Sequence, residues 1–189
     1  MKLTTKLAAI AVATLGTVTA LTPALAAIKF GQQEVDQSKF IAIAVPLKRG
    51  NSQQLTILEQ VSNKRPCWQE SRTSSGPVKV NPLLLTFNFT GICSRATDSN
   101  GYSIRIAGTD LGMRYNISLQ RTATDTLLVG TDRRNPYSEP VVIGRTGGIT
   151  NDISKIQLTP GWRFTKRTYN GKALGHIYLT NDTTALLPR

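Results

Sequence analysis

The side chains best suited to acid–base or nucleophilic chemistry are few in this 189-residue chain, which has one histidine and 11 acidic residues. A serine-hydrolase triad needs a nucleophilic serine on a sharp turn, a histidine base and an acid behind the imidazole. The chain has no G-x-S-x-G motif, and Asp182 is only a plausible neighbour of His176. We therefore interpret His176 as an ordinary strand residue beside Tyr178 and assign no catalytic residue.

Carboxylates offer a second route to chemistry, because glycoside hydrolysis needs only two acidic groups several ångströms apart. The spacing selects no such pair among the acidic residues, which include Glu34, Asp36, Glu59, Glu70, Asp98 and Asp110. A small carboxylate-dependent glycan hydrolase therefore stays open as an alternative function. Phosphate-binding loops, dinucleotide-binding motifs and zinc-hydrolase helices do not occur in the sequence, so we expect no cofactor.

The two cysteines, Cys67 and Cys93, are predicted to form a disulfide, which is common in exported chains with an even cysteine count. One distant histidine adds too few ligands for structural zinc, so no metal site is expected. A catalytic thiol is disfavoured because no motif places a base beside either cysteine. Closing a loop of about 26 residues should stabilise the fold by about 3 kcal/mol.

Positive charge dominates the composition, with 23 Lys and Arg giving a net charge of +12. Such charge attracts anionic glycans, lipid head groups or other acidic polymers, although it can also form a solvated surface that keeps a protein soluble. One predicted strand combines rings with cations and is the candidate ligand-binding face: Trp162, Arg163, Lys166, Arg167 and Tyr169. The alternative is that Trp162 and Phe164 are core residues on one face of that strand.

The N-terminus has the layout of a secretory signal peptide over residues 1–26. Lys2 and Lys6 precede the uncharged stretch from Leu7 to Leu21, and Ala24-Leu25-Ala26 is a small-x-small cleavage site. Cleavage near Ala26 removes these two lysines and lowers the net charge from +12 to +10. We expect an exported protein, located in the periplasm, at the outer surface or outside the cell, without a transmembrane segment in the mature chain and without nucleic acid as its natural partner.

Period-two alternation of apolar and polar residues dominates the rest of the chain and predicts short strands. In Leu83–Phe89 one face would carry Leu83, Leu85, Phe87 and Phe89. The other runs are 39–45, 55–61, 102–106, 115–120, 126–131, 141–144, 153–158, 162–169 and 174–180. Asn100-Gly101 and Asn170-Gly171 predict tight turns, the latter within a hairpin, and a helical turn or two is expected near Gln32–Gln37. We predict a single all-β domain over residues 27–189, an antiparallel β-sandwich or barrel of about ten short strands with one disulfide.

Several motifs then occur in a recognisable order: Phe30–Gln37, Pro66-Cys67-Trp68, Phe89-Thr90-Gly91-Ile92-Cys93 and Asp98–Tyr102. Together they resemble a family of exported cyanobacterial proteins known as domain of unknown function 3747, with F-T-G-I-C as its hallmark. The resemblance runs from about Phe30 to the C-terminal region. It implies a secreted or envelope location and a single domain, and it assigns no activity to any residue.

The observations together favour a non-enzymatic envelope protein that binds or organises anionic cell-surface polymer. They rest on the predicted leader, the positive charge and the missing nucleophile motifs. The alternatives are the glycan hydrolase and a protein-interaction module of the cell surface. The oligomeric state is not predicted.

Overall fold

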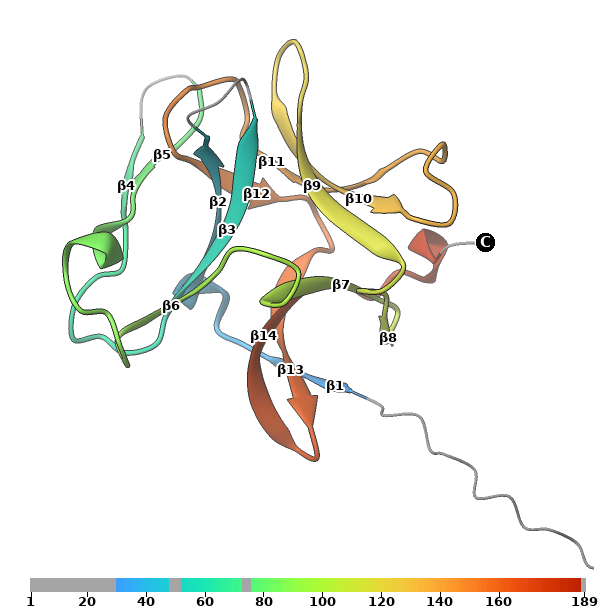
Figure 1. Cartoon of the computed structure of the whole chain (residues 1–189), viewed down its shortest axis with the longest axis horizontal. Coiled ribbons are helices and arrows are strands. Elements are labelled where there is room, and N and C mark those ends of the chain that lie inside the picture. The colour runs from blue at the N-terminus through green and yellow to red at the C-terminus, as the bar shows by residue number, and fades with distance from the viewer. Residues whose placement is uncertain (1–29, 48–51, 73–75, 188–189) are drawn as a thin grey trace, which may run out of the picture.

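The structure is a computed structural model that describes residues 30–47, 52–72 and 76–187, so the predicted leader at residues 1–26 lies outside it. Strands dominate the described residues (Figure 1). The first seven are β1 (Gly31–Glu34), β2 (Phe40–Pro46), β3 (Gln53–Gln60), β4 (Gln69–Ser71), β5 (Lys79–Asn81), β6 (Cys93–Ala96) and β7 (Tyr102–Ile106). The others are β8 (Thr109–Asp110), β9 (Tyr115–Arg121), β10 (Thr126–Asp132), β11 (Val141–Arg145), β12 (Ser154–Leu158), β13 (Arg163–Tyr169) and β14 (Lys172–Asn181).

Helical structure in this part of the chain consists of short 3-10 turns, at Gln37–Lys39, Leu83–Thr86 and Thr184–Leu186. The described ranges contain no helix with the length and apolar character needed to cross a membrane.

The strands form two sheets that curl into a half-barrel (Figure 1). The smaller sheet has the order β1-β13-β14-β7-β8, and the larger has the order β6-β3-β2-β12-β11-β10-β9 with β5 and β4 joined beside β12. Neighbouring strands pair antiparallel except for β14 and β7, which run parallel. The all-β fold and the disulfide predicted from the sequence are confirmed.

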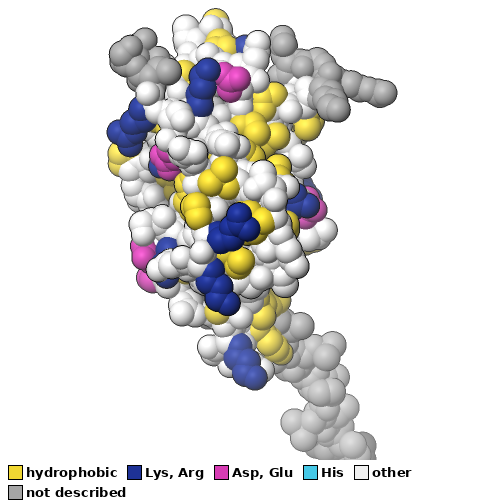
Figure 2. All heavy atoms as spheres, turned by 90° about the vertical axis from the view of Figure 1, so that its left-hand side faces the viewer, with side chains coloured by type: hydrophobic (Ala, Val, Ile, Leu, Met, Phe, Trp, Pro, Cys, Tyr) yellow, Lys and Arg dark blue, Asp and Glu magenta, His cyan; other side chains and the backbone are white. Residues whose placement is uncertain are grey.

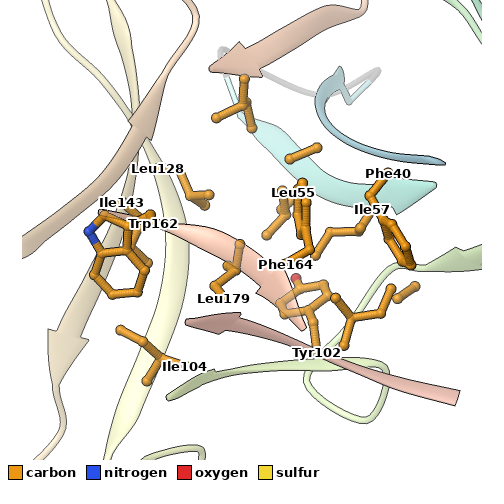
Figure 3. Packing of buried hydrophobic residues seen from close by; sticks show 14 of the residues in the cluster. Phe40, Leu55, Ile57, Tyr102, Ile104, Leu128, Ile143, Trp162, Phe164 and Leu179 are labelled. Atoms are coloured by element: carbon orange, nitrogen blue, oxygen red, sulfur yellow. The ribbon is translucent and has the colours of Figure 1, made fainter. Parts of the chain in front are cut away.

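The main core lies between the two sheets. The smaller sheet contributes Ile104, Phe164 and Leu179. The larger contributes Ile57 and Leu128, and Figure 3 shows these side chains converging from both sides. Trp162 closes one end of the cluster at 8% exposure. Burying apolar surface of this kind stabilises a fold by roughly 25 cal/mol per Å², so the cluster fixes how the sheets face each other.

Strand β2 separates this core from a second, smaller one. Because successive side chains of a strand point to opposite faces, Ala42 and Ala44 enter the main core while Ile41 and Ile43 enter the second. The continuous apolar run at 40–45 therefore marks a strand buried on both faces.

The second core contains the disulfide between Cys67 and Cys93, whose Cα atoms lie 5.8 Å apart. The F-T-G-I-C segment is the turn that places Cys93 there: the backbone N–H groups of Ile92 and Cys93 both donate to the carbonyl of Phe89 at 2.9 Å. Gly91 has a φ of 72°, a left-handed conformation that favours glycine. The motif thus has a structural explanation within the described residues.

Nine of the ten predicted strand runs correspond to strands, namely β2, β3, β7 and β9–β14. The prediction for Leu83–Phe89 is wrong, because Leu83–Thr86 is a 3-10 turn that follows Pro82 and buries only Leu84. The additional strands β1, β4, β5, β6 and β8 have two to four residues each, too few to show an alternation.

The two predicted Asn-Gly turns differ. Asn170 and Gly171 have φ values of 48° and 75° and join β13 to β14 as a hairpin, as predicted. Asn100-Gly101 instead leads from β6 in the larger sheet to β7 in the smaller one, so it does not close a hairpin. The carbonyl of Gly101 accepts the N–H of Ile177 at 2.9 Å, which docks this turn on β14.

Candidate functional site

The smaller sheet has a polar face that is nonetheless buried. Tyr102, Ile104 and Ile106 of β7 point into the main core, so Ser103 and Arg105 point to the opposite face. These two residues are only 5% and 6% exposed. Buried polar groups must find hydrogen-bond partners, and the partners here come from neighbouring strands of the same sheet.

The strand register brings those partners together. Tyr178 of β14 lies opposite Ser103, and Asp110 of β8 lies opposite Arg105. On the other side of β14, strand β13 has a register shift between Lys166 and Thr168. A β-bulge redirects a side chain locally, and the residue at this shift is Arg167.

Arg167, Asp110 and Tyr178 form a closed triangle. The Arg167 Nη2 donates to Asp110 Oδ2 at 2.8 Å, and its Nε donates to the Tyr178 hydroxyl at 2.7 Å. The same hydroxyl donates to Asp110 Oδ2 at 2.8 Å. Burial, together with the bond to Asp110, raises the pKa of Tyr178, so the phenol stays protonated and holds the guanidinium in place.

Arg105 is different because its charge has no carboxylate partner among the described residues. Its Nε donates to Gln32 Oε1 at 2.7 Å, and its guanidinium lies 5.2 Å from the centre of the Tyr178 ring. The carbonyl of Phe30 is a more distant acceptor at 3.5 Å. Among the described residues, the groups that contact this buried cation are thus neutral.

Ser103 and His176 form a hydrogen-bonded pair on the same face. The Ser103 Oγ lies 2.8 Å from His176 Nε2, and His176 Nδ1 lies 2.9 Å from the carbonyl oxygen of Asn100. A carbonyl can only accept, so Nδ1 carries the proton and Nε2 accepts the Ser103 hydroxyl. Burial lowers the pKa of His176, with Arg167 acting in the same direction, which favours the neutral ring in which Nε2 is free to accept.

Ser103, Arg105, Asp110, Arg167 and His176 line a pocket of about 710 Å³, and Tyr178 is buried beneath it. Arg133 and Met113 add exposed side chains, and Phe30 packs its ring 4.6 Å from the Arg167 guanidinium. Asp110 is the carboxylate of the lining, against three arginines: Arg105, Arg133 and Arg167. The pocket therefore has an excess of positive charge and suits an anionic ligand.

The five residues predicted from the sequence as a ligand-binding face do not lie together in the fold. Arg167 lies in the pocket, and Tyr169 stands beside it, 42% exposed, with its ring centre 5.9 Å from that of Phe30. Trp162 is a core residue instead, so its ring is covered. The structure therefore brings together two of the five candidates.

The remaining two cations of that strand bind carboxylates outside the pocket. Arg163 contacts Glu34 and Asp182, each at 2.8 Å, and both raise the pKa of Arg163. Lys166 contacts Glu59 at 2.6 Å and so links β13 to β3. Asp182 therefore pairs with Arg163, whereas His176 is bonded to Ser103.

The acidic residues named from the sequence lie on separate elements. Glu34, Glu59 and Asp110 bind the cations described above. Glu70 forms a further ion pair, with Lys155 at 2.8 Å. Asp36 and Asp98 accept backbone N–H groups of the residues two positions on. Within the described ranges, no three His, Cys, Asp or Glu side chains gather as a metal site would require.

The sequence did not identify Ser103, Arg105, Asp110 and Tyr178 as site residues, and it suggested Asp182, not Ser103, as a neighbour of His176. Ser103 and Arg105 alternate with apolar residues, which is also what a solvent-exposed face looks like. What distinguishes the buried polar face from an exposed one is the pairing of β7 with β14. This parallel pairing joins residues far apart in the sequence, so the local pattern does not show it.

The fold and the site define an all-β, disulfide-linked half-barrel with a basic pocket on the outer face of its smaller sheet. The family model described as "Protein of unknown function (DUF3747)" matches residues 6–184, so the chain belongs to this family, as its motifs indicated. Neither the comparison with curated proteins nor that with solved structures gives a match.

Proposed function

We propose that this is an exported protein whose pocket binds the acidic groups of a cell-surface polysaccharide. The observation that carries the proposal is Arg105, a guanidinium at 6% exposure with no carboxylate partner in the described part of the chain. Burying a charge is costly unless an opposite charge or several hydrogen bonds offset the lost hydration. A carboxylate entering the pocket would supply that missing partner.

The neighbouring groups support binding of an anion with little rearrangement. Arg167 is already fixed by Asp110 and Tyr178, so few side-chain rotations are lost when a ligand arrives. Arg133 extends from the edge of the pocket and forms no ion pair with a described residue. Together these arginines offer several donors to a carboxylate, for which the planar guanidinium is well suited.

Two features favour a sugar polymer over a small inorganic anion. The rings of Phe30 and Tyr169 lie beside Arg167, where the apolar face of a sugar could pack. Basic side chains also occur far from the pocket: on the face seen in Figure 2, Lys and Arg are scattered singly among apolar and neutral groups. Dispersed positive charge attracts a long polyanion from many directions, and the pocket would select its acidic residue.

A matched pair of variants tests the binding. Arg133 lines the pocket and its neighbour Arg134 does not, so R133Q and R134Q remove the same charge at adjacent positions. We expect R133Q to weaken binding of fluorescent polygalacturonate by about 10-fold, about 1.4 kcal/mol, and R134Q by less than about 2-fold. Neutral dextran should not bind to either. Equal losses of affinity for R133Q and R134Q would mean that the polymer is held by general charge attraction, and would contradict binding in the pocket.

Export is a separate part of the proposal and has its own test. The arrangement of Lys2, Lys6 and the Ala24-Leu25-Ala26 site supports secretion. N-terminal sequencing of protein recovered from outside the cytoplasm should begin at Ala27. Recovery of the uncleaved chain in the cytoplasm would contradict export.

A further inference from the structure

We infer that Ser103 is a nucleophile with His176 as its general base, and that the pocket cleaves small ester groups. This goes beyond binding, since it assigns a reaction to residues that anion recognition does not need. Ser103 and His176 are given these roles because of the geometry of their hydrogen bonds. The placement of the ester on an acidic polysaccharide rests on the proposed function.

The first support is the direction of the hydrogen bonds. The Asn100 carbonyl fixes the His176 proton on Nδ1, so Nε2 faces the Ser103 hydroxyl as an acceptor at 2.8 Å. A base within hydrogen-bond reach of a hydroxyl, itself oriented by a third group, is the arrangement that activates a serine. Here a backbone carbonyl takes the place of the acid that usually orients the imidazole.

The second support is a cation at the place where negative charge would develop. Arg167 Nη2 donates to Ser103 Oγ at 3.3 Å and to Asp110 Oδ2 at 2.8 Å, so the guanidinium is held beside the atom that would attack. Donors that are already in place stabilise the oxyanion of a tetrahedral intermediate without rearranging during the reaction. The backbone N–H of Gly112 donates to Asp110 Oδ1 at 3.0 Å and so helps to hold the carboxylate that fixes the guanidinium.

The third support is access from the pocket. Ser103 and His176 both line it although each side chain is largely buried. The segment after β8 passes close to the serine at Gly112, where an added Cβ would lie 3.2 Å from Ser103 Oγ. The absence of a side chain at Gly112 thus lets this segment pack against the serine without displacing it.

The reaction balances with water as the co-reactant. Ser103 Oγ bonds to the carbonyl carbon while its proton moves to His176 Nε2, and the ester C–O bond then breaks as that proton passes to the leaving alcohol. Water, deprotonated by Nε2, attacks the acyl-serine, and the proton returns to Ser103 as the acid leaves. The products are an alcohol and a carboxylic acid, with no change in oxidation state.

The test is covalent labelling of the purified, oxidised protein with diisopropyl fluorophosphate. This probe is uncharged, so the result does not depend on anion binding. We expect one adduct, located on Ser103 by peptide mapping of the unmutated protein. No adduct under conditions that fully label trypsin, or an adduct only on other serines, would overturn the inference.

Variants then separate the chemistry from a structural role. S103A should remove the adduct, H176Q should slow labelling by about 100-fold or more, and S118A on β9 should leave it unchanged. Folding of each variant is checked by circular dichroism. Because S103A could disturb the fold, the labelling rate of the unmutated protein is also measured against pH.

The rate should rise as His176 loses its proton, with a midpoint below about pH 6.5, and should be level above about pH 7. The groups that face His176 are Arg167, Asp110, Ser103 and Tyr178, whose ring packs edge-on against the imidazole. Of the charged groups, Arg167 lowers the pKa of His176 and Asp110 raises it. A rate without this acid limb would also contradict the inference.

Discussion

Arg105 of β7 donates a hydrogen bond to Gln32 of β1 although two other strands, β14 and β13, lie between them. Neighbouring strands are about 4.8 Å apart, so the backbones of these two are separated by roughly 14 Å along the sheet. Their side chains span this gap over Tyr178, whose ring centre is 5.2 Å from the Arg105 guanidinium. The polar face is therefore covered by its own long side chains, with the pocket beside them.

Replacing Arg105 should separate stability from binding. Because R105M removes a buried charge and keeps most of the side-chain volume, we expect the free energy of unfolding to stay unchanged or to rise by about 1 kcal/mol. Binding to polygalacturonate should fall by at least about 10-fold. Urea unfolding and anisotropy titration measure the two effects, and unchanged affinity would contradict a role for Arg105 in recognition.

R163M is the comparison for stability. Arg163 contacts the exposed carboxylates of Glu34 and Asp182, and exposed ion pairs contribute only about 0.2–1 kcal/mol each. We therefore expect R163M to lower the free energy of unfolding by about 1 kcal/mol. A greater loss for R105M than for R163M would show that Arg105 is a structural residue.

His176 should make the fold sensitive to mild acid. Burial lowers the pKa of His176 in the folded chain, while the unfolded chain takes up this proton near pH 6.5. The folded state therefore loses stability as the pH falls below about 6.5, and His176 contributes no pH dependence above about pH 7. Urea unfolding between about pH 5 and pH 7.5 should show this slope, and H176Q should flatten it. The same slope in H176Q would assign the effect to another group.

The disulfide should matter for stability and not for the pocket. Cys67 and Cys93 lie in the second core, which is separated from the main core and from the smaller sheet by β2 and β3. The double variant C67A/C93A should lower the free energy of unfolding by about 3 kcal/mol. At low denaturant concentrations, the affinity of this variant for polygalacturonate should stay within about 2-fold of that of the unmutated protein. A large change in affinity with the fold intact would show that the two regions are coupled.

Gly112 should be intolerant of any side chain. A Cβ at this position would lie 2.9 Å from the Ser103 Cβ, so either Ser103 or the chain after β8 must move. We expect G112A to lower the free energy of unfolding by about 1–3 kcal/mol and to slow labelling of Ser103.

The matched control is G175A, because nothing lies within 4 Å of a Cβ added there. It should leave stability and labelling essentially unchanged. If G112A and G175A behave alike, the close approach at Gly112 has no role in the site.

Much of the fold could be predicted from the sequence because its strands are long enough to show their alternation. The run at 115–120 has the clearest alternation, and it lies within β9 (Tyr115–Arg121). The apolar alternation of Leu83–Phe89 misled because only Leu84 is buried there, against the second core, while Leu85 is 62% exposed. Periodicity cannot distinguish a strand from a segment that lies across a small core.

The site was harder to predict, because it depends on strand order. Ser103 and His176 are 73 residues apart, and they meet only because β14 runs parallel to β7. Arg167 could be found among the cations beside aromatic residues. Arg105 could not, because a buried arginine and a solvated one give the same alternation along a strand.

The most direct test of anion recognition is an NMR titration that follows the arginine Nε–H signals while trigalacturonate is added. Binding in the pocket predicts saturable shifts at Arg105 and Arg167, whose guanidinium groups line it, and none at Arg163, which is bound by Glu34 and Asp182. Signals are assigned with R105M and R163M. Small, unsaturable shifts spread over the exposed arginines, with Arg105 unmoved, would contradict binding in the pocket.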